Sequence, residues 1–98
     1  MGATDFSSIA AGKTSREAFE AAKASALHQY GHGGYTGTLA EKDDFIVIPT
    51  PPLTSSDAAD LAEELIANDD DRISDKWGPA GAIAVEGGQW LFFGFASS

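Results

Sequence analysis

The sequence contains no cysteine, only six lysines and arginines, and no apolar run longer than four or five residues. Without cysteine the chain has neither a disulfide bond nor a thiolate metal ligand, so its hydrophobic core alone has to hold the fold together. The apolar runs are far too short to cross a bilayer, and the N-terminus lacks the basic and apolar regions of a signal peptide. We therefore expect a soluble cytoplasmic protein with no membrane partner and no metal or other cofactor.

Fifteen acidic residues outnumber the six basic ones and give a net charge of −9, with an isoelectric point near 4.3. A field of this sign repels the phosphate backbone of DNA and RNA, which argues against direct nucleic-acid binding. The length of 98 residues corresponds to one domain, residues 1–98, with a single modest core.

Two segments have the apolar spacing of amphipathic helices. The first is residues 15–30, where Thr14 and Glu17 match a capping box and Gly31 suits a left-handed C-cap. The second is residues 56–68, whose apolar residues recur at helical spacing while its acidic residues lie mostly on the other side.

Shorter segments between and after the helices have the composition of strands. Asp43 and Asp44 separate two of them, and Gly87 and Gly88 separate two others, which is typical of hairpin turns. The order β-α-β-β-α-β-β predicts an α+β fold with an antiparallel sheet of four to five strands and both helices on one face. The expected strands are residues 35–41, 45–48, 82–85 and 89–95, with a short first strand at 5–10.

The last expected strand is apolar on both faces, because Trp90 and Phe92 point one way while Leu91 points the other. If both helices lie on one face, the other face needs a different cover. Exposed apolar patches of several hundred Å² usually mark an interface. The sequence therefore predicts a homo-oligomer.

The segment 31–38 holds four glycines in seven positions, next to polar side chains. It either lets a ligand approach the backbone closely or is a helix C-cap followed by a sharp turn into a strand. It follows a helix C-terminus, and no Lys-Ser or Lys-Thr pair comes after it, so it is neither a P-loop nor a dinucleotide fingerprint. Its candidate ligand-binding residues are His32, Gly33, Gly34, Tyr35, Thr36 and Thr38.

Lys42, Arg72 and Lys76 make up half of the cations on the chain, and Trp77 follows the last of them directly. If these residues converge with the glycine-rich segment, they form a basic, aromatic pocket in which the ring stacks a base and the cations hold phosphates. These four residues are therefore further ligand-binding candidates, and the expected partner is a small anionic, nucleotide-like ligand. The alternative is a loop pinned by a buried Trp77.

No motif predicts catalysis. The chain has no cysteine nucleophile, no Gly-x-Ser-x-Gly elbow and no His-Glu-x-x-His helix. His32 is the only candidate acid–base group, and no orienting carboxylate is near it in the sequence. The acidic run at 68–71 lacks the glycine and the distal glutamate of a calcium loop, so no metal site is expected. We therefore expect a binding protein rather than an enzyme.

Three runs along the chain are distinctive: GHGGYTGTLAEK at 31–42, DKWGPAG at 75–81 and QWLFFGFAS at 89–97. Together with the Met-Gly-Ala start and a Thr-x-x-Glu-Ala-Phe helix, the chain resembles small proteins encoded by tailed bacteriophages and prophages. The resemblance covers nearly the whole chain and implies the cytoplasm of an infected or lysogenic bacterium. In size, build and host context such a protein is similar to anti-defence sponges, which sequester cyclic nucleotide or cyclic ADP-ribose signals.

The leading hypothesis is thus a non-enzymatic homo-oligomer that sequesters a nucleotide-derived immune signal. The first alternative is an acidic inhibitor that binds a host defence protein as a DNA mimic. The remaining alternatives are a virion structural protein and a nucleotide hydrolase that uses His32. The charge of the acidic inhibitor would come from Asp57, Asp60, Glu63, Glu64 and the run 69–71.

Overall fold

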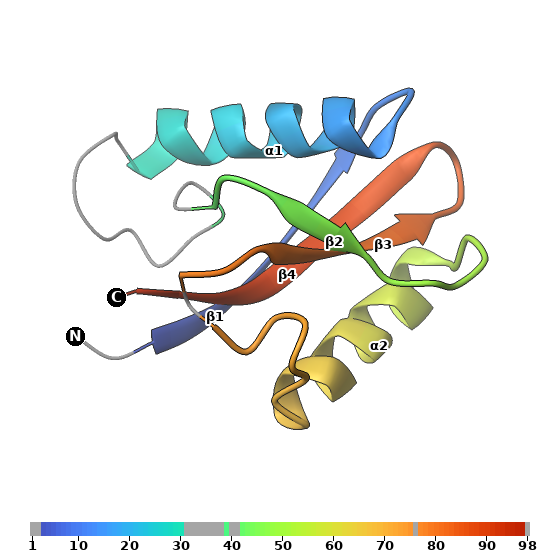
Figure 1. The fold of residues 1–98 in the computed structure, drawn as a ribbon. Coiled ribbons are helices and arrows are strands. Elements are labelled where there is room, and N and C mark those ends of the chain that lie inside the picture. The colour runs from blue at the N-terminus through green and yellow to red at the C-terminus, as the bar shows by residue number, and fades with distance from the viewer. Residues whose placement is uncertain (1–2, 31–38, 40–41, 76, 98) are drawn as a thin grey trace.

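The computed structural model describes residues 3–30, 39, 42–75 and 77–97, which form two helices and one four-stranded sheet (Figure 1). The strand order is β1-β4-β3-β2. Strand β4 is antiparallel to both of its neighbours, whereas β2 runs parallel to β3. The elements are β1 (Ala3–Ala11), α1 (Ser15–Tyr30), β2 (Phe45–Val47), α2 (Ser55–Ala67), β3 (Ala80–Val85) and β4 (Gln89–Ser97).

Both helices begin at threonine N-caps, and the first of them is the cap predicted from the sequence. The Thr14 hydroxyl accepts a hydrogen bond of 3.1 Å from the Glu17 amide, and the Glu17 carboxylate accepts one from the amide of Lys13. At the start of α2 the Thr54 hydroxyl accepts a 3.2 Å bond from the Asp57 amide. Helix α1 has the bounds predicted for it, and α2 lies one residue earlier than predicted. In the described part of the chain, neither helix is long and apolar enough to cross a membrane.

The α+β class, the two helices and the C-terminal hairpin are confirmed. Gly87 and Gly88 in the hairpin turn have φ angles of +84° and +75°, which side chains disfavour. The sheet is mixed rather than antiparallel, because β2 pairs in parallel with β3. The strand predicted at 35–41 lies outside the described residues except for Leu39, which is buried in the core below α1.

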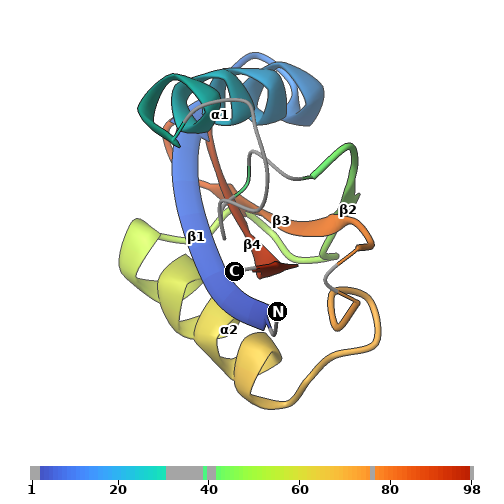
Figure 2. The ribbon, with the colours of Figure 1, turned by 90° about the vertical axis from the view of Figure 1, so that its left-hand side faces the viewer.

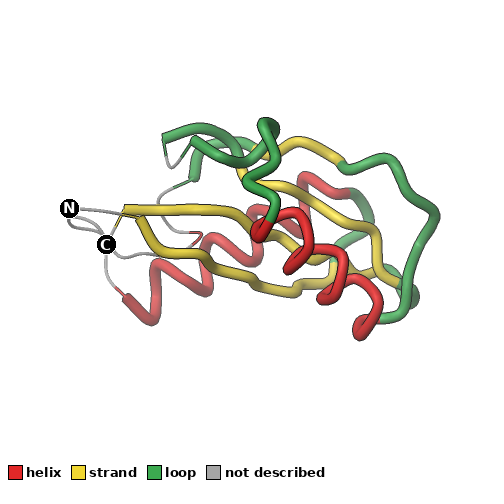
Figure 3. The backbone as a smooth tube through the Cα atoms, turned by 90° about the horizontal axis from the view of Figure 1, so that it is seen from below, coloured by secondary structure: helices red, strands yellow, loops and turns green. Residues whose placement is uncertain are grey.

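The two helices cover opposite faces of the sheet, so the prediction of both on one face is wrong (Figures 1 and 2). Helix α1 buries Phe19 against Phe92 on one side of the sheet. On the other side α2 packs Ala58 and Ala62 against a cluster of buried residues. Seen from below in Figure 3, α2 lies in front of the strands and α1 behind them. That second cluster contains Ile48, Ile73, Ile83, Val85, Leu91 and Phe93.

The direction of the chain across the sheet explains this arrangement. Strands β1, β2 and β3 all point the same way, because β4 is antiparallel to both β1 and β3. The chain first crosses by α1 from one edge, β1, to the other edge, β2, and then returns by α2 to β3. Crossovers between parallel strands are almost always right-handed, so two crossovers in opposite directions place their helices on opposite faces.

Each face of the sheet therefore has its own helical cover. The prediction of a homo-oligomer rested on one apolar face being left uncovered, and that premise is wrong because α2 covers it. Any assembly of this protein needs a different surface.

Candidate functional site

An open groove of about 270 Å³ lies where the chain enters two neighbouring strands. Because β2 and β3 are parallel and Phe45 pairs with Ala80, the segments that precede the two strands lie side by side. The groove is lined by Asp43 and Asp44 from the first segment and by Trp77, Gly78 and Pro79 from the second.

Trp77 is the most exposed large apolar residue among those described, with 63% of its surface accessible. The alternative of a loop pinned by a buried Trp77 is therefore wrong. Its backbone amide donates a 2.8 Å hydrogen bond to the carboxylate of Asp75, and the next amide, that of Gly78, donates to the carbonyl oxygen of Asp75 at 2.9 Å. These bonds fix the turn that holds the tryptophan at the surface.

Lys42 lies beneath this turn and is buried, with 1% of its surface accessible. Its ammonium group donates a 2.9 Å hydrogen bond to the carbonyl oxygen of Gly78 and lies 3.5 Å from that of Asp75. The same ammonium lies 5.9 Å from the centre of the Phe6 ring. Backbone carbonyls and an aromatic face thus surround a charge that would be very costly to bury without partners.

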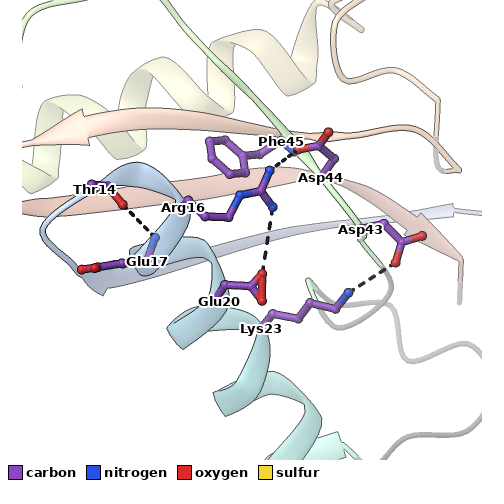
Figure 4. A network of polar contacts seen from close by, with 8 residues as sticks. All are labelled: Thr14, Arg16, Glu17, Glu20, Lys23, Asp43, Asp44 and Phe45. Carbon is purple, nitrogen blue, oxygen red and sulfur yellow. Dashed lines mark hydrogen bonds and ion pairs between the residues drawn. The ribbon is translucent and has the colours of Figure 1, made fainter.

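The carboxylate of Asp44 is held by a network from α1 and β2 (Figure 4). It accepts a hydrogen bond of 2.8 Å from the amide of Phe45 and one of 3.0 Å from the guanidinium of Arg16. The amide bond first, and then Arg16, lower the pKa of Asp44 below its usual value. The Arg16 guanidinium also lies 4.9 Å from the centre of the Phe45 ring. These two hydrogen bonds orient the Asp44 carboxylate at the rim of the groove and favour its ionised form.

Asp43, by contrast, projects into solvent with a fully exposed side chain. Its only described ionic partner is Lys23 on α1, whose ammonium lies 3.3 Å from the carboxylate. An exposed pair of this kind contributes little stability and exchanges readily with another cation. Asp43 is thus available to contact a positively charged group that enters the groove.

The structure brings together two of the ten predicted ligand-binding residues, Lys42 and Trp77, at the turn beside the groove. The six candidates at positions 32–38 and Lys76 lie outside the described residues. Lys42 faces backbone carbonyls, which is a structural contact and differs from the predicted contact with phosphate.

Arg72 pairs with Asp70 in the turn after α2 and does not line the groove. Its Nε and Nη2 atoms each donate a 2.9 Å hydrogen bond to that carboxylate, whose pKa falls to about 2 because of these bonds and the bond from the Arg72 amide. The same hydrogen bonds raise the pKa of Arg72. The predicted contact of Arg72 with a ligand phosphate would have to compete with this bidentate pair.

No sequence pattern marks Asp43 and Asp44 as site residues, because two adjacent aspartates between predicted strands are typical of a hairpin turn. Only the parallel pairing of β2 with β3 puts them next to Trp77. A Gly-Pro step directly after a tryptophan is the one local sign that this side chain is displayed on a rigid turn.

The outer side of α2 and the turn after it form a second acidic surface. None of its carboxylates makes an ion pair with a described basic residue. Like charges three and four positions apart destabilise a helix slightly, so these carboxylates do not stabilise α2. The exposed carboxylates of this acidic surface are Asp57, Asp60, Glu63, Glu64, Asp69 and Asp71.

Within the described residues, no group of three or more His, Asp or Glu side chains could hold a metal ion. No family model, no curated protein and no solved structure matches this chain. The function has therefore to be inferred from the geometry of the chain itself.

Proposed function

We propose that this protein works by binding a partner protein, with Trp77 as the anchor of the contact and the surrounding carboxylates selecting a basic surface. The observation that carries the proposal is that Trp77 is 63% exposed on a turn held from below by the buried Lys42. Tryptophan is strongly enriched among the few residues that contribute most to protein–protein binding energy.

The rigid turn supports this role. A side chain presented on a fixed backbone loses less conformational entropy on binding than one on a mobile loop. The groove beside the indole leaves room for a side chain of the partner. Arginine fits this place best, because its guanidinium can stack on the indole and bond to Asp43.

The charge of the whole chain favours the same kind of partner. A net charge of −9 attracts a basic surface over long range and speeds the encounter. The acidic surface on α2 adds to this field, because its carboxylates have no described cationic neighbours within ion-pair distance. If the resemblance to phage-encoded proteins holds, the partner is a host defence factor.

A nucleotide-derived ligand is the second candidate, favoured by the exposed indole, which can stack on a base. The described groove is less suited to phosphate, since two of its five lining residues are aspartates. Calorimetry with cyclic nucleotides and ADP-ribose derivatives measures this candidate directly, and binding at micromolar concentration or tighter would favour it over a protein partner.

The test of the protein-binding proposal compares immobilised wild-type protein with Trp77→Ala in a bacterial lysate, followed by affinity measurement with each purified captured protein. We expect the partner to bind Trp77→Ala at least about tenfold more weakly, as for an interface anchor. Val47→Ala is the matched control, because Val47 is 47% exposed at the far end of β2 from the groove. Equal binding by Trp77→Ala and wild type would contradict the proposal.

A further inference from the structure

The sheet has two edge strands, β2 and β1, and they differ in how well they are protected against pairing with a strand of another chain. At one edge β2 has only three residues, and Pro49 follows shortly after it. The carboxylate of Asp44 also accepts a hydrogen bond from the amide of Phe45. Short strands, nearby prolines and capped amides are the usual means of preventing an edge from pairing with another chain.

The other edge, β1, has none of these protections. It runs for nine residues without proline, lysine or arginine, and Asp5 is its only charged residue. Among the described residues, no segment pairs with its outer side. Figure 2 shows β1 along the side of the molecule nearest the viewer. A long, nearly uncharged edge of this kind is a template for another strand.

The register shows which backbone groups of β1 point outward. The amide of Gly12 donates to the carbonyl of Gly88 at 3.2 Å, which continues the antiparallel pairing of β1 with β4. Hydrogen-bonded and non-hydrogen-bonded pairs alternate along such a ladder, so the even-numbered residues of β1 bond to β4. The odd-numbered residues, Asp5, Ser7, Ile9 and Ala11, direct their amides and carbonyls away from the sheet.

Their side chains are exposed as well. Ile9 has 46% of its surface accessible, and Asp5, Ser7 and Ala11 are also exposed. The odd-numbered side chains lie on the α2 face, opposite residues such as Leu91 and Phe93 of β4. Helix α2 packs on β3 and β4 and leaves this part of β1 open.

We infer that β1 pairs with β1 of a second copy of this chain, antiparallel and about a twofold axis at Ile9, to give one continuous sheet across the dimer. In this register Ile9 lies against the partner's Ile9, and Ser7 lies opposite the partner's Ala11. Asp5 comes within reach of the partner's Lys13, which is exposed just beyond the end of the strand. The pairing thus covers the exposed isoleucine and joins opposite charges.

Helix α1 leaves room for such a partner. Arg16 and Lys23 reach from one flank of α1 to Asp44 and Asp43 beside β2, so the opposite flank of the helix faces the β1 edge. That flank includes Ala21, which is exposed and small. Short side chains there allow the two α1 helices of a dimer to lie close together.

A second copy fits this edge better than a basic peptide of a foreign protein does. Six exposed carboxylates that would attract such a peptide lie on α2 and in the turn after it, and two more lie directly before β2, whereas β1 itself carries only Asp5. This assembly is independent of the proposed partner binding, since Trp77 lies at the groove before β2 and β3, and β4 separates these two strands from β1.

Sedimentation equilibrium over a wide concentration range tests the inference, and we expect a reversible dimer. Ser7→Pro removes only an outward amide and keeps the ladder to β4, so it should yield a folded monomer. Ile9→Lys should also give a monomer, whereas Ile46→Lys, at a residue 37% exposed on the other edge strand, should stay dimeric. Circular dichroism and thermal melts establish that each variant is folded. A monomeric wild type, or a folded Ser7→Pro dimer, would overturn the inference.

Cysteine crosslinking tests the register, because the chain has no cysteine of its own. Directly paired residues on antiparallel strands lie about 4.5–5.5 Å apart at Cα, within the range that a disulfide spans. Ile9→Cys should therefore form a covalent dimer under mild oxidation, and Val47→Cys should not. A crosslink with Ser7→Cys in place of Ile9→Cys would overturn the twofold axis at Ile9.

Discussion

The ammonium group of Lys42 donates a 2.9 Å hydrogen bond to the carbonyl oxygen of Gly78, 36 residues later in the chain. This bond ties the segment before β2 to the segment before β3, and these two segments form the walls of the groove. A buried cation thus supports a surface feature, since Trp77 precedes Gly78 directly. This contact therefore couples the buried core to the candidate site, in addition to the pairing of β2 with β3.

Replacing Lys42 by methionine should destabilise the protein, because it leaves the carbonyl of Gly78 without its bond while keeping most of the side-chain volume. We expect the free energy of unfolding to fall by about 1–3 kcal/mol, as for a buried polar group that loses its partner. Urea denaturation measures the change. Lys23→Met is the control, since its pair with the exposed Asp43 should contribute no more than about 1 kcal/mol.

Trp77→Phe should leave the free energy of unfolding within about 0.5 kcal/mol of wild type, because the side chain is mostly exposed. Acrylamide quenching checks the exposure that this expectation assumes. The Trp90→Phe protein retains only Trp77 and should be quenched strongly, whereas Trp77→Phe retains the half-buried Trp90 and should be quenched less. The reverse order would mean that Trp77 is not the displayed indole.

The free energy of unfolding should fall as the pH is lowered from about 4 to about 2. Hydrogen bonds from Arg72 lower the pKa of Asp70 from 3.8 to about 2 in the folded protein. In that interval the unfolded chain binds a proton more readily than the folded one, so lowering the pH favours unfolding. Above pH 4 the contribution of Asp70 is fully present.

Thermal melts from pH 5 to pH 2 measure this loss, and Asp70→Asn should lose less stability over the interval because it has no carboxylate to protonate. The pKa of Asp44 is also lowered in the folded protein, so Asp44 also contributes to the loss of stability at low pH. Parallel slopes for wild type and Asp70→Asn would rule out the Arg72 pair as a cause.

Gly81→Ala should be destabilising, because an added Cβ would lie 2.5 Å from Cζ of Phe93 and 3.0 Å from Cγ2 of Ile73. Overpacking of this kind typically costs about 1–3 kcal/mol. A double-mutant cycle with Phe93→Leu tests the cause by urea denaturation. The cost of Gly81→Ala should be smaller in the Phe93→Leu protein, and additive effects would contradict a direct clash.

The local elements of this fold could be predicted from the sequence because their signals are local. Thr14 and Thr54 cap the helices, and Gly87 and Gly88 form the hairpin turn, within a few residues of the structure they determine. The pairing of β2 with β3 joins residues 35 positions apart, such as Phe45 and Ala80, and no local sequence pattern predicts this pairing. The missed parallel pairing also caused the wrong placement of α2.

The site could be predicted only in part for the same reason. The sequence predicts Trp77 as a ligand-binding candidate, with a buried Trp77 as the alternative. Asp43 and Asp44 reach it only through the pairing of β2 with β3. The sequence predicts Lys42 as a cation that pairs with a ligand phosphate, whereas the structure buries it, which is rare for lysine. The structural role of Lys42 depends on hydrogen bonds to two carbonyl groups of a loop distant in sequence. The composition of the chain does not predict these bonds.

Strand β4, residues 89–97, lies between β1 and β3 and is the last element along the chain. It contributes Phe92 to the cluster below α1 and Phe93 to the cluster below α2. Until these residues leave the ribosomal exit tunnel, β1 therefore lacks its neighbouring strand and α1 lacks Phe92 to pack against. Neither core is complete without β4, because this strand contributes residues to both of them.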